Sequence, residues 1–430
     1  MRMQLTRGRL AGLVATAALM AGVEARADET AAPAAEPTAP APAQEEAGDA
    51  GVAPSATAPE APSPPSSNVT ARVSAQMAAY QDSTATTVFT PNVGASVENP
   101  TSGWGVNGRY LVDMVSAASP DIVATASPRW SETRHAGSLG GQYKPGNFGG
   151  GVNASLSYTN DYLAFSGGGN LLLDLDEKNW TLLAGYTYGH DTVGRTGTAF
   201  AVFGHPVDFH NGTLGVTRLL GPSSVLSIGV DGVVEKGDQS KPYRYIPMFA
   251  PGAADKLGPG ASADDVARLR IQARPLEQLP LDRGRVAVTA RFAYRASSLT
   301  LRAEERLYAD SWAMLASTTD VRVPLDVGRR VILWPHLRGH VQKGVNFWQR
   351  VYTATSAADL PALRTGDREL GPLWTAGLGG GARFGLGSSE DPFSFSILTS
   401  VDAYYTRFTD ALYVTDRVSG LATVVGEVKF

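Results

Sequence analysis

The sequence contains no cysteine, which excludes several kinds of chemistry at once. Without a thiol the chain has no disulfide framework, no thiolate metal ligand, no cysteine nucleophile and no attachment point for a lipoprotein anchor. Charged residues are scarce as well, at 18%, and hydrophobic residues make up 43% of the 430 positions. This balance is low in charge for a helical soluble enzyme and too polar for a helical membrane protein.

Long apolar runs are also missing outside the N-terminus. The run of 14 residues from Leu10 to Val23 follows a basic start and precedes Ala25-Arg26-Ala27. Because such a run is too short to cross a bilayer as a helix, the pattern predicts a secretory signal peptide rather than a membrane anchor. We expect residues 1–27 to be removed before Asp28.

Basic residues are absent from residues 28–71, which hold seven acidic residues and nine of the 27 prolines. Such a composition predicts a disordered, extended, Ala/Pro-rich periplasmic segment. It serves either as a spacer or as a tether to periplasmic export components or peptidoglycan. Subtracting both N-terminal segments leaves 33 basic (37 − 4) and 33 acidic (41 − 1 − 7) residues in 72–430. A neutral body argues against nucleic-acid binding.

The rest of the chain alternates apolar and polar residues with a period of two. Between residues 285 and 342, four segments do so over about ten residues each, which is typical of strands with one apolar and one polar face. The first apolar series is Val286, Val288, Ala290, Phe292 and Tyr294. Either a soluble β-sandwich or a membrane-spanning barrel satisfies this pattern.

Strand length and loop lengths favour the barrel. The strands are longer than the five or six residues usual in sandwiches, and the short connections follow even-numbered strands whereas the long ones follow odd-numbered strands. We predict an all-β, antiparallel transmembrane β-barrel of about 16 strands (14–18) over residues 72–430, in the outer membrane of a Gram-negative bacterium. Strand centres are expected near residues 76, 91, 110, 138, 154, 168, 184, 213, 229, 290, 303, 319, 336, 380, 400 and 424.

The C-terminal strand ends in an aromatic residue. Phe430 is preceded at alternate positions by Val428 and Val424, a pattern similar to the signal by which the barrel-assembly machinery recognises outer-membrane barrels. Aromatic residues near other strand ends, among them Trp104, Tyr158 and Trp312, suit the girdles at the membrane interfaces. Both features indicate that outer-membrane lipid surrounds the wall.

One motif reads Tyr110-Leu-Val-Asp113-Met-Val-Ser116-Ala-Ala-Ser119-Pro-Asp121, with Arg129, Glu132 and Arg134 following. It resembles a poorly characterised bacterial family of secreted outer-membrane β-barrels of unknown function. The resemblance is clearest over residues 72–190 and implies the fold but no catalytic role. The charged members could tie an external loop inward by ion pairs, or they could be turn residues and solvated charges.

Motifs for catalysis or metal binding are lacking. His336 and His340 have helical zinc-site spacing, but on a strand four residues span about 13 Å, too far for one metal ion. We therefore interpret both histidines as polar lumen residues. No G-x-S-x-G motif occurs, and the glycine-rich stretch 377–382 lies in a strand, where close packing explains it better than a dinucleotide. We expect no metal, no cofactor and no enzymatic activity.

The strongest candidate site is a basic wall on the polar faces of residues 285–342. Its predicted members are Arg285, Arg291, Arg295, Arg302, Glu304, Arg306, Asp320, Arg322, His336, Arg338 and His340. With two carboxylates against seven arginines, about five positive charges are in excess, so the wall could attract anions. Alternatively, it could be a structural ladder balanced by acidic residues elsewhere. Glu305 interrupts the apolar face, which suggests a position near the rim or a local bulge.

These observations predict a conduit for anionic or polymeric solute, in one version for polysaccharide export. The main alternative is a structural or surface-binding barrel whose loop 237–281 plugs the lumen or meets an external ligand. That loop contains a possible helix, 262–273, with Ser262 placed to cap it. A lipid-modifying enzyme is the least favoured alternative.

Overall fold

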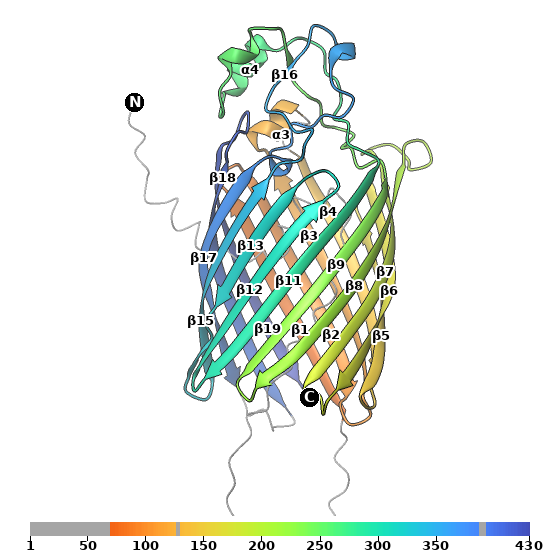
Figure 1. Cartoon of the computed structure of the whole chain (residues 1–430), viewed down its shortest axis with the longest axis vertical. Coiled ribbons are helices and arrows are strands. Elements are labelled where there is room, and N and C mark those ends of the chain that lie inside the picture. Colours follow the sequence, from red (N-terminus) through yellow and green to blue (C-terminus); the bar gives the residue numbers. More distant parts are fainter. Residues whose placement is uncertain (1–68, 126–129, 387–392) are drawn as a thin grey trace, which may run out of the picture.

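The computed structural model describes residues 69–125, 130–386 and 393–430. Within them one antiparallel sheet curls into a closed barrel (Figure 1). The barrel closes because β1 (Thr70–Asp82) pairs with β19 (Asp416–Lys429) over eleven consecutive positions, from Arg72–Lys429 to Asp82–Ser419. The predicted signal peptide and most of the predicted linker lie outside the described residues.

The other strands are long and follow one another around the barrel in chain order. They are β2 (Thr86–Asn99), β3 (Trp104–Ala117), β4 (Trp130–Tyr143), β5 (Phe148–Tyr158), β6 (Tyr162–Leu175), β7 (Trp180–Val193), β8 (His205–Gly221), β9 (Ser224–Gly237), β11 (Asp282–Ala296), β12 (Leu299–Asp310), β13 (Leu315–Arg322), β14 (Leu325–Val327), β15 (Val331–Lys343), β17 (Leu373–Leu386) and β18 (Ser394–Phe408).

The sheet has 17 strand segments, but β13 and β14 share one position because both pair with β12 on one side and β15 on the other. The barrel therefore has 16 strand positions, which confirms the fold predicted from the alternation. Short turns join the strands at the end where Thr70 and Lys429 lie, and the long connections gather at the opposite end (Figure 1). In barrels of this type the short turns face the periplasm.

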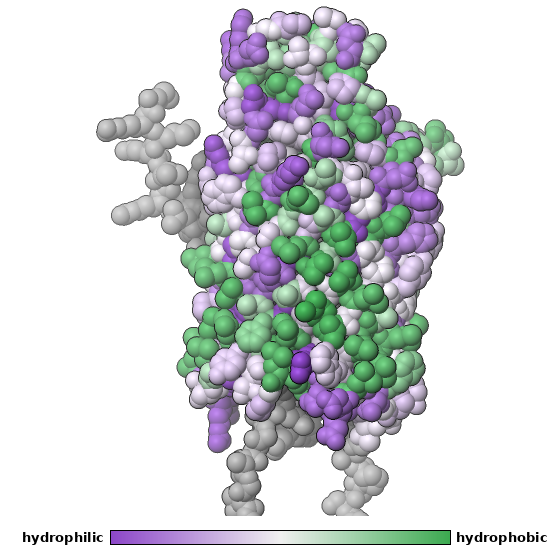
Figure 2. All heavy atoms as spheres, in the orientation of Figure 1, coloured by the Kyte–Doolittle hydropathy of each residue, from purple (hydrophilic) through white to green (hydrophobic). Residues whose placement is uncertain are grey.

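The outer face of the wall is apolar, as a lipid-facing surface requires. Exposed side chains at alternate positions include Met77, Leu139, Val152 and Leu214, which are 62–70% accessible. Figure 2 shows hydrophobic side chains gathered over the strands, whereas hydrophilic ones prevail at the long-loop end. The fold is thus that of an outer-membrane β-barrel. Among the residues described, no helix is long and apolar enough to cross a membrane.

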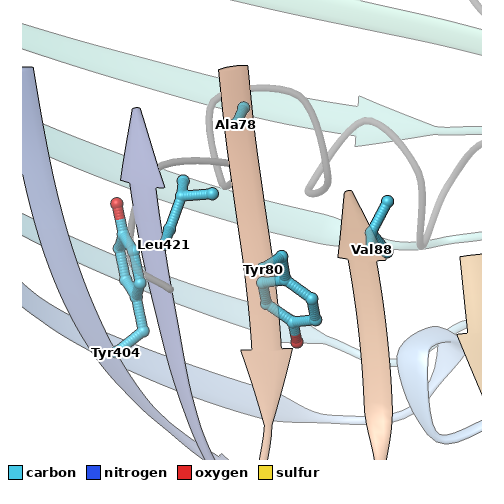
Figure 3. Packing of buried hydrophobic residues seen from close by; sticks show 5 residues of the cluster. All are labelled: Ala78, Tyr80, Val88, Tyr404 and Leu421. Atoms are coloured by element: carbon cyan, nitrogen blue, oxygen red, sulfur yellow. The ribbon is translucent and has the colours of Figure 1, made fainter. Parts of the chain in front are cut away.

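Apolar side chains also line part of the inner face where the barrel closes. Ala78, Tyr80, Val88, Tyr404 and Leu421 form one buried cluster on β1, β2, β18 and β19 (Figure 3). The Tyr80 hydroxyl donates a hydrogen bond of 2.9 Å to the neighbouring Asp82 carboxylate. The cluster packs the seam between the first and last strands towards the long-loop end.

Glu305 lies neither at the rim nor in a bulge. It sits in the middle of β12 and pairs in register with Ala290 on one side and Thr319 on the other. Its carboxylate faces outward and accepts hydrogen bonds from the hydroxyls of Ser317 (2.6 Å) and Thr319 (2.5 Å). Glu305 therefore interrupts the apolar outer face, and two hydroxyls of the next strand satisfy the hydrogen-bonding capacity of its carboxylate.

The long connections fold together above the barrel mouth (Figure 1). We call the connections 238–281, 344–372 and 409–415, together with helix α3 (Pro120–Thr125), the cap. Its elements are β10 (Met248–Phe249), η1 (Ala254–Lys256), α4 (Ala263–Leu269), β16 (Tyr352–Thr353), η2 (Ala357–Asp359) and η3 (Arg368–Leu370). The parallel pairing of β10 with β16 joins the first two connections.

The cap has apolar cores of its own. One contains Ile246, Met248, Tyr352, Ala354 and Leu360, and another adds Leu412 from the third connection. Ser262 caps α4 as predicted, since its side chain accepts from the Asp265 amide, but the helix ends at Leu269 rather than at 273. It ends there because the Ile271 amide bonds instead to the Met248 carbonyl. Trp312 is 3% exposed at the base of the cap and so belongs to no membrane girdle.

Candidate functional site in the barrel lumen

The predicted basic wall lies on the inner face of four adjacent strand positions, β11, β12, β13 and β15. The outer face of β11 carries Val286, Val288 and Tyr294, so the arginines between them face the lumen. Strand register then aligns the polar side chains of the wall: Arg291 lies opposite Glu304, Glu304 opposite Asp320, and Asp320 opposite Arg338. The alternation in the sequence had placed all of these residues on one face.

Ion pairs neutralise more of this wall than the sequence indicates. Arg285 pairs with Glu235 of β9 at 2.8 Å, and Arg295 pairs with Asp326 of β14. Arg291 binds Glu304 at 2.5 Å, while Arg322 (3.2 Å) and Arg338 (3.6 Å) share Asp320. Seven arginines against four carboxylates leave an excess of three, so the expected excess of about five is too large.

Arg302 and Arg306 are the two wall arginines for which no ion pair occurs among residues 69–125, 130–386 and 393–430. Both side chains are exposed on β12. Arg302 lies opposite Arg322 on β13, and Arg306 lies between Thr289 and Thr318, so no carboxylate stands directly beside either one. These two residues present uncompensated positive charge to the lumen.

Exposure changes steeply along β11 from the mouth towards the membrane centre. The Arg283 side chain is 0% exposed, that of Arg285 is 9% exposed and that of Arg291 is 59% exposed. Arg283 binds Asp310 at 2.6 Å beneath the Trp312 ring, which lies 4.1 Å from the guanidinium. The arginines next to the cap are therefore buried, whereas Arg291 further down the same strand is accessible to water.

His336 bridges two carboxylates on the same wall. Its Nδ1 lies 2.5 Å from Asp402 Oδ1 on β18, and its Nε2 lies 2.7 Å from Asp320 Oδ2 on β13. An ionised carboxylate only accepts hydrogen bonds, so both ring nitrogens donate and the imidazole acts as a cationic link. The link passes over β17, where Gly379 leaves the space open. His340 lies two inward positions further along β15 and forms a hydrogen bond of 2.8 Å with Thr318.

Gly379 is needed for this link, which gives a first testable prediction. A Cβ at this position would lie 2.0 Å from Asp402 Oδ1 and 2.5 Å from the Val401 carbonyl oxygen. Gly379→Ala should therefore lower the free energy of unfolding by about 1–3 kcal/mol, the usual cost of overpacking. Urea unfolding of the detergent-solubilised barrel, followed by tryptophan fluorescence, measures the change.

The matched control is Gly339→Ala on β15, where a Cβ meets nothing within 4 Å. This substitution should be neutral or slightly stabilising, because it restricts the unfolded chain. Equal losses for both variants would contradict the packing role of Gly379.

Glycines on β17 also make room for two aromatic side chains. A Cβ at Gly377 would lie 2.5 Å from the Tyr404 ring, and one at Gly381 would lie 2.3 Å from the Trp334 ring. The glycine-rich stretch thus serves close side-chain packing. Trp334 was absent from the predicted wall, although it shares the even-numbered, inward positions of β15 with His336 and Arg338. The alternation of β15 was therefore sufficient to predict that Trp334 faces the lumen.

The motif of residues 110–134, which resembles the uncharacterised family, lies at the long-loop end of β3 and β4. Asp113 is buried, accepts a hydrogen bond of 3.1 Å from Arg134 Nε and also binds the Thr90 hydroxyl. This ion pair joins neighbouring strands of the wall. Ser119 is fully buried, and its carbonyl accepts from the Val123 amide at the start of α3.

The remaining residues of the motif are spread over the same region. Ser116 lies opposite Ser131 in the β3–β4 ladder, and Asp121 lies in α3. Arg129 lies outside the described residues. Glu132 on β4 contacts Asp161, which follows β5.

Asp161, which is not among the predicted site residues, connects two of the long-loop segments. It accepts hydrogen bonds of 2.7 Å from both Tyr243 in the cap and Thr196 in the β7–β8 connection. Burial by itself would raise the pKa of Asp161, but these hydrogen bonds outweigh it and lower the pKa. Asp161, which is not part of the 110–134 motif, therefore connects the cap to the β7–β8 connection.

A buried polar network holds the cap together on the other side. Asp367 is 5% exposed, accepts a hydrogen bond of 2.7 Å from Lys241 and pairs with Arg244. Burial alone would raise the pKa of Asp367, but the two cations hold it far below its usual range. Nearby, burial raises the pKa of Tyr352 to about 12. The network joins connections 238–281 and 344–372 through charge as well as through apolar packing.

The residues of the predicted assembly signal lie at the barrel seam. Phe430 exchanges backbone hydrogen bonds with Ala71 at 2.8 and 3.2 Å, and its exposed ring packs edge-on against Phe393 with centroids 5.9 Å apart. Val424 is exposed on the outer face, and Val428 pairs with Val73 of β1. Recognition by the assembly machinery stays a prediction.

Comparison with known proteins gives a family match over part of the chain but no activity. Residues 208–389 match the model of a family described as "Protein of unknown function (DUF3570)". This match supports the resemblance to an uncharacterised family, although it lies C-terminal to residues 72–190, where the sequence motif had placed it. The chain is thus similar to a poorly characterised outer-membrane barrel family. No curated protein matches the chain.

Several solved outer-membrane barrels have similar folds at very low identity. A bacterial polysaccharide outer membrane secretin is 9% identical with a TM-score of 0.42, covering 85% of this chain and 99% of its own. A loop-deletion mutant of OmpT from Vibrio cholerae is 9% identical with a TM-score of 0.39 (84% and 99%). The CymD monoaromatic hydrocarbon channel is 7% identical with a TM-score of 0.37 (84% and 87%). Identities this low do not indicate a shared substrate.

Proposed function

We propose that this protein is a channel of the outer membrane for anionic solutes, including an acidic polymer such as a polysaccharide. The observation that carries the proposal is the pair Arg302 and Arg306, which are exposed to the lumen without an ion pair among the described residues. A barrel near 16 strands has room for an aqueous channel. Guanidinium groups attract anions and bind carboxylates or phosphates through two parallel hydrogen bonds. The proposed role is passive conduction without a chemical step.

In the polymer version of this proposal, residues 28–71 act as a periplasmic tether. Their acidic, proline-rich composition suits an extended segment that binds an export component or peptidoglycan. Outer-membrane lipid and the barrel-assembly machinery complete the proposed partners. Deleting residues 28–71 should then lower polymer export in cells and leave the conductance of the purified barrel unchanged.

Ion selectivity in planar bilayers tests the channel. With a salt gradient, the reversal potential of the wild type should report a preference for chloride over potassium. Arg302→Glu with Arg306→Glu replaces the uncompensated positive charge by negative charge and should turn the preference towards potassium. The measurement is the shift in reversal potential between the two proteins.

Arg218→Glu is the control for a charge reversal outside the lumen. Arg218 lies on β8 with its guanidinium 4.6 Å from the Trp180 ring, on the outer face. The same change of charge outside the lumen should leave selectivity as in the wild type. Absence of any pore, or a selectivity that does not respond to reversal at 302 and 306, would refute the anion channel.

A second candidate function is binding at the cell surface, which the folded cap favours. The cap contains a recess lined by Arg244, Tyr245, Arg350, Tyr352 and Tyr413, among others. Arginine and tyrosine side chains suit a polar, ring-containing ligand. Binding of the full chain to arrayed surface glycans, lost on replacement of the cap connection 241–278, would favour this function over conduction.

A further inference from the structure

Trp334 differs from Trp104, Trp312, Trp348 and Trp374 because it lies on the lumen wall. Trp104 and Trp374 are exposed on the outer face of strands. Trp312 and Trp348 lie in or beneath the cap and donate their indole N–H to the carbonyls of Asp282 and Asp367. Trp334 occupies an inward position of β15, four residues from the short-turn end of that strand.

The Trp334 ring lies along the wall. Its Cζ2 and Cε2 atoms occupy the space into which a Cβ at Gly381 would project, at 2.3 and 2.5 Å. One side of the ring therefore packs on the backbone of β17. The residue is only partly buried, so part of its side chain is accessible, and its inward position directs that part to the lumen. A flat aromatic surface that faces water inside a channel is a platform on which a ring can stack.

Positive charge lies beside this platform. Arg322 is directly opposite His336, which makes Trp334 its diagonal neighbour, and such neighbours lie about 7–8 Å apart. Arg302 is directly opposite Arg322 on the next strand. Because Asp320 already binds Arg322 while Arg302 has no ion pair in the described residues, the second arginine is available to an incoming anion.

We propose that Trp334, Arg322 and Arg302 form a binding subsite for an acidic sugar residue of a polymer passing through the lumen. The apolar C–H face of a pyranose ring stacks on the indole, as flat rings do on aromatic platforms. The carboxylate of a uronic acid reaches the guanidinium of Arg302, and Arg322 adds a second positive charge. This subsite rests on the proposed channel function and names its substrate class.

Neighbouring groups fit this assignment and complete the subsite. The indole N–H of Trp334 makes no hydrogen bond among the described residues, although it is not sealed from water, so it is available to a sugar hydroxyl. Arg383, on the inward face of β17 two residues beyond Gly381, extends the basic surface towards the periplasmic mouth. A polymer arriving from the periplasm meets these residues before it reaches the cap.

Calorimetric titration of the full chain in detergent with hexagalacturonate tests the subsite. Binding should be detectable for the wild type and at least about tenfold weaker for Trp334→Ala, the loss expected when one stacking platform is removed. Trp334→Phe keeps a flat ring and should recover most of the affinity. Trp374→Ala removes an outward-facing tryptophan from the adjacent strand and should change nothing. Neutral maltohexaose should bind more weakly than hexagalacturonate to the wild type.

The possible failures of the two proposals are separable. If the barrel selects anions in bilayers but Trp334→Ala binds hexagalacturonate as tightly as the wild type, the subsite is wrong and the channel proposal stands. Equal affinity for maltohexaose likewise overturns the acidic-sugar assignment. If hexagalacturonate binds through Trp334 but no ion current passes, the subsite stands and passive conduction of small anions is wrong.

Discussion

Replacing cap residues 241–278 by a short glycine–serine turn is expected to raise the single-channel conductance several-fold. The turn fits because the chain ends at this point lie together: the Leu279 amide donates to the Ser240 hydroxyl at 2.9 Å. The replacement removes β10 and α4, and with them most of the two apolar cores of the cap. Connection 344–372 then loses its packing partners from residues 241–278, so the mouth should be less obstructed. Planar-bilayer recordings of wild type and variant measure the difference.

Removing residues 199–203 from the connection between β7 and β8 is the matched control, because it leaves the bond from Thr196 to Asp161 in place. This connection stands at the same end of the barrel, and its exposed Val202 belongs to none of the cap cores. Its shortening should leave conductance nearly unchanged. If removal of 241–278 has no larger effect than this control, the cap does not restrict the channel.

The strand architecture could be predicted because barrel strands carry a strong local pattern. Alternation fixed the inward side of every strand in the wall, and the lengths of successive connections fixed the two ends of the barrel. The same alternation also contained Trp334, at an even position between Ile332 and His336, but the predicted wall was limited to charged residues and histidines. This omission was one of interpretation, since the residue obeys the pattern.

The charge balance of the wall could not be predicted, because it depends on register between strands far apart in sequence. Glu235 neutralises Arg285 from 50 positions away, and this contact follows from the alignment of β9 with β11. Asp402 reaches His336 only because Gly379 on the intervening strand has no side chain. Counting the charged residues of each strand predicts that the wall is positively charged but overestimates the excess of positive over negative charges.

The cap was beyond sequence analysis for a different reason. Its organisation depends on contacts between connections more than 100 residues apart, such as the pairing of Met248 with Tyr352. Neither segment has the length or periodicity that identifies a strand by itself. The predicted end of α4 failed for the same reason, since the Met248 carbonyl captured the amide that would have continued the helix.

Asp367→Asn is expected to open the cap, because Asp367 is the buried carboxylate on which Lys241 and Arg244 converge. Removing one member of a buried ion pair costs about 3–5 kcal/mol, since the remaining charges stay desolvated. Amide hydrogen exchange at residues 246–249 and 352–354, where the two connections pair, should quicken accordingly. Protease cleavage within the cap should quicken in parallel.

The pH dependence gives an independent check on the same carboxylate. The pKa of Asp367 is lowered in the folded cap, so its contribution is fully present above the pKa of an unfolded aspartate, about 3.9. It is lost as the pH falls below that value towards the folded pKa. Cap protection in the wild type should therefore be constant from neutral to mildly acidic pH and decline in stronger acid, whereas Asp367→Asn loses this component of the pH dependence.

Asp410→Asn provides the matched control within the same cap. Asp410 pairs with Arg350, but its side chain is 42% exposed, and exposed pairs contribute about 0–1 kcal/mol. Its loss should leave exchange at 246–249 close to that of the wild type. Equal effects of the two substitutions would mean that the cap responds to any lost carboxylate, and unchanged exchange in Asp367→Asn would mean that apolar packing alone keeps it closed.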